Sequence, residues 1–155
     1  MMPSALSKLL EKFSHEARII EVSNVTFPLP HGYEVYQGYI RIPFRGMVAE
    51  GKITAMKSEE GSLLGLLVSL RGNPNVIACS IACYSHLIGM KPKIIYYDVH
   101  EPTGIADITA EWYKGGINIR QRLAHHELLG YKVKKTIRFE DVLKEARKFL
   151  EEAYK

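Results

Sequence analysis

Hydrophobic residues along this chain follow two spacings, and each spacing predicts a type of element. Near the start they recur every three or four positions, which is typical of an amphipathic helix. These residues are Leu6, Leu9, Leu10 and Phe13. Three later segments, bounded by Pro or Gly, have the composition of strands: 18–27, 33–42 and 47–56. We expect these three strands to form a meander.

The third of these segments has the clearest alternation. Small or apolar residues occupy one face: Met47, Ala49, Gly51, Ile53 and Ala55. Polar residues occupy the other face: Glu50, Lys52 and Thr54. This pattern predicts a strand with one buried and one solvent-exposed face. The small side chains on the buried face would allow a helix to pack closely across the sheet.

The middle of the chain contains one ambiguous segment and one well-defined helix. Residues 63–70 are continuously apolar, and this pattern does not distinguish a buried strand from a short buried helix. In the helix that follows, Asn73 is a good N-cap and Pro74 suits the first helical position, while Gly89 ends the element. Because this helix is apolar on nearly all sides, we expect it to be buried.

The remainder of the chain adds strands and helices in turn. Residues 93–99 and 105–113 are rich in β-branched and aromatic side chains, which predicts two strands. Their short connection leaves no room for a helical crossover, so we expect them to pair antiparallel. A helix over 117–130, a strand over 132–139 and a final helix over 140–155 follow. Together these elements predict one α+β domain, residues 1–155, with a mixed, mostly antiparallel sheet and helices packed on it.

Composition narrows the class of protein. A chain of 155 residues with 46% hydrophobic content can bury one core. Its longest apolar stretches are interrupted before they reach the roughly 20 residues of a membrane span, and we find no secretory signal. Two cysteines are too few to staple a secreted fold, so we expect a soluble, cytoplasmic protein. The net charge of +4 permits an anionic partner without requiring one.

The densest group of titratable side chains surrounds the turn between strands 93–99 and 105–113. It comprises Asp98, His100, Glu101 and Asp107. His100 can act as a general acid or base, and the carboxylates can orient it or hold a cation. These four are therefore our candidate catalytic residues. The alternative is an ordinary hairpin whose polar residues serve only the turn and face water.

The chain direction places a helix start near that turn. The helix that begins at Asn73 runs toward the strand 93–99, so its N-terminus should lie at the same end of the sheet as the acidic turn. Such an N-terminus offers unpaired N–H groups to a phosphate or carboxylate. The candidate ligand-binding residues are Arg71, Gly72, Asn73 and Asn75. This constellation predicts binding of a small anionic or phosphorylated metabolite, with acid/base catalysis if the protein is an enzyme.

Two further groups carry weaker signals. A double glycine at 115–116, flanked by Lys114 and Arg120, resembles an anion-binding turn, but the antiparallel topology puts it at the opposite end of the sheet. Cys79, Cys83 and His86 share one helix face. Three residues of one helix are too few for a zinc site, so core packing is the better interpretation and we predict no metal.

The segment 32–45 interleaves tyrosines with arginines, a composition that also occurs in stacking platforms for single-stranded nucleic acid. Alternation puts Tyr39 and Arg41 on one face and Tyr36 on the other, which favours ordinary sheet packing. An RNA-binding module that uses this segment is one alternative function. It would also use Lys132, Lys134 and Lys135.

A structural homo-oligomer without catalysis is another alternative. Symmetric dimers are common, so we expect self-association in any case. The sequence contains no catalytic-triad, zinc-protease, calcium-loop or phosphate-loop motif. It therefore identifies no cofactor.

Overall fold

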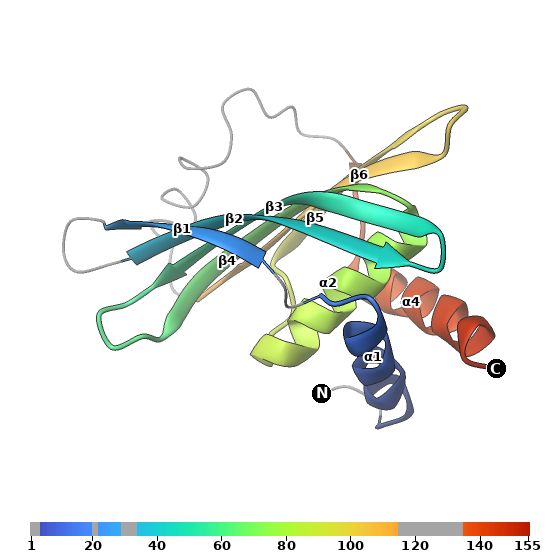
Figure 1. Ribbon diagram of the computed structural model, residues 1–155, viewed down its shortest axis with the longest axis horizontal. Coiled ribbons are helices and arrows are strands. Elements are labelled where there is room, and N and C mark those ends of the chain that lie inside the picture. The colour runs from blue at the N-terminus through green and yellow to red at the C-terminus, as the bar shows by residue number, and fades with distance from the viewer. Residues whose placement is uncertain (1–3, 20–21, 29–33, 115–134) are drawn as a thin grey trace.

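The computed structural model describes residues 4–19, 22–28, 34–114 and 135–155, and Figure 1 shows their arrangement. Within these residues, helices cover one face of a single sheet. The helices are α1 (Ser4–Glu16), α2 (Pro74–Ile88) and α4 (Phe139–Ala153). The strands are β1 (Val22–Pro28), β2 (Glu34–Phe44), β3 (Met47–Lys57), β4 (Leu63–Gly72), β5 (Ile94–His100), β6 (Ile105–Tyr113) and β7 (Lys135–Thr136).

The strands lie in the order β1-β2-β3-β4-β6-β5-β7, and each described pair is antiparallel. This confirms the α+β class, the N-terminal meander and the antiparallel pairing of strands 93–99 and 105–113. The ambiguous segment 63–70 belongs to strand β4. It lacks a period of two because Leu66 and Val68 are buried beneath the helices while Leu67 is buried on the opposite face.

Helix α2 forms the centre of the core. Ten consecutive side chains, from Val76 to Ser85, are buried in it. The helix contacts the sheet on one side and both α1 and α4 on the other. The Asn73 side chain caps its N-terminus and Gly89 ends it in a left-handed conformation, as the sequence predicts. An apolar helix is stable here because neighbouring elements surround it.

The alternation predicted for strand β3 holds over only part of its length. Ala49 is buried against the helices and Glu50 and Lys52 are exposed, as expected. Thr54 was expected to face solvent, but it is fully buried. Val35 and Met56 form a second small cluster on this outer face of the sheet, the face turned away from the helices. Both faces of β3 are therefore covered at this end.

Some expected elements fall outside the described residues. These are the helix over 117–130, the double glycine at 115–116 and the beginning of the strand 132–139. Only Lys135 and Thr136 of that strand form β7, which pairs with Tyr96 and Tyr97 of β5; the expected strand was too long at its end, since Phe139 already begins α4. The final helix, expected over 140–155, is α4, whose apolar stripe includes Val142, Ala146 and Leu150.

At Gly51 the backbones of β3 and β4 leave no room for a side chain. A Cβ atom at this position would lie 1.9 Å from the backbone oxygen of Ser69, well inside the distance at which two atoms can coexist. Only a residue without a side chain allows the two strands to pair here.

We expect Gly51→Ala to destabilise the protein by about 3 kcal/mol or more, because the new methyl group must push the β4 backbone away. Gly46→Ala is a suitable control: a Cβ there meets nothing within 4 Å, so only the strain of its positive φ remains, about 1–2 kcal/mol. Urea unfolding of both variants measures the difference. If Gly51→Ala lost less stability than Gly46→Ala, the close approach of β3 and β4 at Gly51 would be contradicted.

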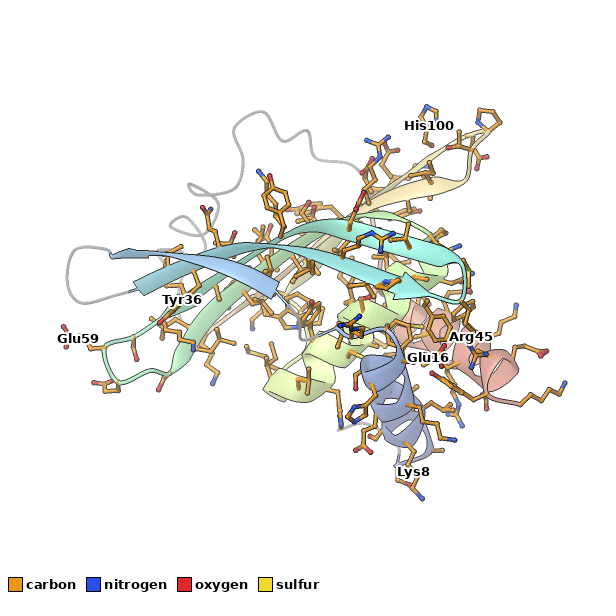
Figure 2. All side chains as sticks on the ribbon, viewed as in Figure 1. Lys8, Glu16, Tyr36, Arg45, Glu59 and His100 are labelled. Carbon is orange, nitrogen blue, oxygen red and sulfur yellow. The ribbon has the colours of Figure 1, made fainter. Side chains whose placement is uncertain are left out.

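A polar joint ties three elements together beside the core (Figure 2). Arg45, in the turn between β2 and β3, donates hydrogen bonds from Nε and Nη2 to the two carboxylate oxygens of Glu16, at 2.8 and 3.2 Å. Tyr154, just after α4, donates its hydroxyl to the same carboxylate at 2.9 Å. The guanidinium also lies 4.8 Å from the centre of the Tyr154 ring. These contacts fix the end of α1 to the sheet and to the C-terminal helix.

Because this joint contains a carboxylate, the stability of the protein should depend on pH. The hydrogen bond from Arg45 lowers the pKa of Glu16 below its usual 4.5. A lowered folded-state pKa stabilises the protein above the unfolded pKa, and the effect is lost as pH falls through the folded pKa. We expect wild type to exceed Glu16→Gln in free energy of unfolding at pH 7, by the modest amount typical of exposed ion pairs.

The difference between the two proteins should be smaller at pH 3 than at pH 7, because the stabilisation from a lowered pKa diminishes as pH falls below the usual value of 4.5. Urea unfolding at both pH values is the measurement. A difference that is equal at pH 3 and pH 7 would show that the carboxylate charge plays no part.

Candidate functional site

The structure brings part of the sequence-predicted site together on the outer face of the sheet. Arg71 on β4 lies opposite Asp107 on β6, and Asp107 lies opposite Asp98 on β5. The Arg71 Nε is 3.9 Å from Asp107 Oδ1, and both side chains are more than half exposed. The expected proximity of the segment before α2 to the acidic strands is therefore confirmed. The pair is exposed and forms no enclosed site.

His100 and Glu101 lie at the tip of the β5–β6 hairpin, which projects beyond the helices (Figure 2). Both side chains are exposed. The His100 Nδ1 is 3.1 Å from the Thr103 hydroxyl, which donates to the His100 carbonyl and accepts from the Ile105 N–H. These bonds close the turn on itself. The geometry is that of a self-contained hairpin turn, the alternative interpretation of this segment.

The start of α2 is occupied by its own chain. The Asn73 Oδ1 accepts hydrogen bonds from the N–H groups of Asn75 and Val76, at 2.9 and 3.1 Å. The Asn73 N–H donates to the Val48 carbonyl. Gly72 has a φ of +146°, and a Cβ there would lie 2.2 Å from the same carbonyl oxygen. Close strand packing accounts for Gly72 and capping accounts for Asn73 without a ligand, whereas Asn75 takes part only through its backbone N–H.

Charged side chains form a regular row across the outer face. We call Arg41, Glu50, Arg71 and Asp107 the charged row; they occupy the adjacent strands β2, β3, β4 and β6 at matching register positions. The Arg41 Nε lies 3.9 Å from Glu50 Oε2, which repeats the spacing of Arg71 and Asp107. The signs alternate along these four positions, and Asp98 on β5, opposite Asp107, adds a second negative charge at the next position. Cross-strand pairing of opposite charges stabilises a sheet locally, so the arrangement has a structural role.

The tyrosines of β2 are divided between the faces, as the alternation predicts. Tyr39 lies on the outer face and is 69% exposed, with the Lys52 ammonium 5.8 Å from its ring centre. Tyr36 lies on the other face, next to Lys57. Tyr33, Lys132 and Lys134 of the suggested RNA-binding surface fall outside the described residues. The described tyrosines therefore do not form a continuous stacking platform.

Cys79 and Cys83 are core residues. Their side chains are almost fully buried in α2, and no disulfide joins them. Burial raises the pKa of the Cys83 thiol to about 12 and raises the pKa of Cys79 further. Within the described part of the chain, no group of three His, Cys, Asp or Glu side chains is placed to hold a metal ion. The interpretation as core packing fits both thiols.

We expect neither thiol to react with 5,5′-dithiobis(2-nitrobenzoic acid) in the folded protein, because the reactive thiolate is suppressed and the sulfur is shielded. Both should react in 6 M guanidinium chloride. The absorbance of the released thionitrobenzoate measures the reaction. Rapid modification of one thiol under native conditions would contradict the buried placement.

A cleft lies where the C-terminal end of α2, strand β5 and the N-terminus of α4 meet. We call it the β5–α4 cleft, and its volume is about 560 Å³. Its lining residues come from two segments: Met90, Lys91, Pro92, Lys93, Ile94 and Ile95 from the first, and Thr136, Ile137, Arg138, Phe139 and Glu140 from the second. The Ile137 N–H donates to the Ile95 carbonyl at 3.0 Å, which holds the two walls together.

The cleft combines an apolar floor with a basic rim. Ile95, Pro92 and Phe139 are buried, whereas Lys91, Lys93 and Arg138 are exposed. The sequence does not reveal this site, because its two walls are far apart along the chain and neither contains a motif. One local signal was present, since Lys91 and Lys93 flank a proline immediately after a helix.

A second, shallower hollow of about 430 Å³ lies beside the charged row, lined by Tyr39, Ile40, Arg41, Glu50 and Gly51. The outer face also holds buried polar side chains next to this region. Ser69 and Thr109 share a hydrogen bond of 2.9 Å, and Glu111 is 92% buried on the same strand as Thr109. These polar residues were not singled out from the sequence, because isolated polar positions in a strand carry no motif.

Comparison with known proteins identifies no relative. No family model matches the chain, and neither the curated proteins nor the solved structures contain a significant match. Among the helices of the described residues, none has the length and apolar character needed to cross a membrane. Any functional conclusion must therefore come from the geometry of the chain itself.

Proposed function

We propose that this protein binds a small ligand with an anionic group and an apolar body in the β5–α4 cleft. The observation that carries this proposal is the combination of an apolar floor and three cationic side chains around one hollow. Ligand sites are typically concave, mostly apolar and fitted with a few polar groups that orient the ligand. The volume of about 560 Å³ lies within the usual range for small-molecule sites.

The charge at the rim favours an anion. Lys91, Lys93 and Arg138 contribute three positive charges, while Glu140 contributes one negative charge. The Arg138 Nε lies 4.0 Å from Glu140 Oε2, a weak exposed contact that leaves the guanidinium able to bind a ligand. Arg138 presents a planar fork that suits a carboxylate or phosphate, and the two lysines add point charges.

The apolar floor favours a ligand with more than a bare anionic group. Met90, Ile94 and Ile137 line the cleft and are half-buried, so they offer accessible apolar surface. The buried Ile95 and Phe139 connect this lining to the main core. Contact with such a floor removes apolar ligand surface from water, which contributes about 25 cal/mol for each square ångström. Inorganic phosphate alone would use the rim and leave the floor uncovered.

The proposal keeps the ligand class expected from the sequence and assigns it to different residues. Arg71, Asn73 and His100 do not line this cleft. The described lining residues include neither histidine nor cysteine, so they support binding rather than a specific catalytic step. The free, buried cysteines are consistent with the cytoplasmic location expected from the sequence.

The RNA-binding alternative gains little support from the described surface. Arg41 and Arg71 each lie beside a carboxylate, so their charge is locally balanced. A dedicated nucleic-acid surface gathers unbalanced positive charge along one face. The β5–α4 cleft is the better candidate because its positive charge exceeds its negative charge.

Two fluorescent probes test the proposal. 8-Anilino-1-naphthalenesulfonate carries an anionic group on an apolar body, and N-phenyl-1-naphthylamine is its uncharged counterpart. We expect the anionic probe to bind more tightly, and Lys93→Ala and Arg138→Ala to weaken its binding about fivefold each while affecting the uncharged probe little. The estimate assigns about 1 kcal/mol to each exposed charge-assisted contact. Fluorescence titration gives the dissociation constants.

Lys148→Ala is the matched control, since Lys148 is exposed on α4 and does not line the cleft. Its affinity for either probe should equal that of wild type. An equal loss of affinity for the anionic probe in Lys148→Ala and Arg138→Ala would show that the effect comes from the overall charge of the protein and not from the cleft. If wild type bound the two probes with equal affinity, the anionic group would contribute nothing to binding, which would contradict that part of the proposal.

A further inference from the structure

The charged row has an order that is complementary to itself. From β2 to β6 the signs run positive, negative, positive, negative, in Arg41, Glu50, Arg71 and Asp107. Reversing this order gives negative, positive, negative, positive. A second row turned end to end therefore meets the first with an opposite charge at each position.

The row is accessible for such a contact. The side chains of Arg41 and Glu50 are 66% and 64% exposed, and those of Arg71 and Asp107 are 65% and 52% exposed. In the described residues, the helices all lie on the other face of the sheet (Figure 1). Tyr39, exposed on the outer face two residues from Arg41, adds an aromatic side chain of the kind enriched at interfaces.

We propose that the outer face of the sheet, centred on the charged row, docks onto the same face of a second copy of this chain. The two-fold axis would run parallel to the strands, between β3 and β4. It would place Glu50 of each copy opposite Arg71 of the other, and Arg41 opposite Asp107. Two sheets packed face to face keep their strands roughly aligned, which suits this axis.

The charge pattern also selects the orientation of the dimer. A two-fold axis running across the strands, along the row, would place Arg41 on Arg41 and Glu50 on Glu50. Like charges brought together at an interface oppose association. A second copy fits the row better than a nucleic acid or an acidic peptide does, because those partners present charges of one sign to a surface where the signs alternate.

The interface would be polar and sensitive to salt. Neighbouring strands are about 4.8 Å apart, so the four residues of the row span about 15 Å. Their exposed charges are screened within about 10 Å at 0.1 M salt. The dimer should therefore weaken as salt rises, unlike an assembly held by apolar burial.

Sedimentation velocity over a range of protein concentrations tests the proposal. We expect wild type to associate at 50 mM salt to about twice the 17.6 kDa chain mass, and to dissociate at 0.5 M. Glu50→Arg and Arg71→Glu should each weaken association at least tenfold, because each places two like-charged contacts across the two-fold axis. Arg147→Glu, on the exposed side of α4, is the control and should associate like wild type.

The double variant Glu50→Arg/Arg71→Glu separates contacts between copies from contacts within one chain. It places like charges side by side within the chain, at positions 41 and 50 and at positions 71 and 107. Across the proposed two-fold axis, however, each position still meets an opposite charge. We expect the double variant to recover the association that each single variant loses.

Three outcomes would overturn the proposal. The first is a wild type that stays monomeric at 100 µM and 50 mM salt. The second is single variants that associate like wild type, which would place any dimer interface elsewhere. The third is a double variant that associates no better than the single variants, since the contacts would then act within the chain. This proposal does not depend on the ligand proposed for the β5–α4 cleft.

Discussion

The burial of α2 on all sides determines where the other elements lie. The helix presents Val76, Ile77 and Ile81 among its buried side chains and has no polar side to expose. The sheet covers one side, and α1 and α4 cover the rest. Its buried polar atoms have partners: the Ser80 hydroxyl donates to the Val76 carbonyl, and the Ser85 hydroxyl donates to Ile81 and accepts from the Trp112 indole. Satisfied polar groups make such deep burial possible.

This constraint also sets the location of the two candidate surfaces. Because the described helices gather on one face, the charged row stands on the other face without a helix above it. Because α2 ends at Ile88 and the chain turns through Gly89 into β5, residues 90–95 line one hollow together with residues 136–140 at the start of α4. The β5–α4 cleft forms at that junction. Its floor belongs to the core, and its rim belongs to segments that leave the core.

Much of the fold could be predicted from the sequence. The cap at Asn73, the ending at Gly89 and the short link between β5 and β6 each depend on local chemistry, and each was identified. Strand β4 was ambiguous because Leu66 and Leu67 are both buried, on opposite faces, which removes the alternation that marks a half-exposed strand. Thr54 was misplaced for a related reason, since burial on the outer face depends on residues distant in the chain.

The candidate site was harder to predict. Asp98, His100 and Glu101 attract attention as neighbours in sequence, yet the structure spreads them along an exposed hairpin. Lys93 and Arg138 come together only after the sheet and α4 are assembled. A clustering of titratable residues in sequence indicates solvent exposure as readily as a site, whereas a cleft depends on tertiary packing.

Mapping of amide chemical shifts by NMR tests the location of the ligand site most directly. The anionic naphthalenesulfonate probe would be titrated into ¹⁵N-labelled protein. We expect the largest changes at residues 93–95 and 137–140, with little change at the hairpin tip. Largest changes at residues 71–75 and 98–107 would instead place binding at the acidic turn and contradict the assignment to the β5–α4 cleft.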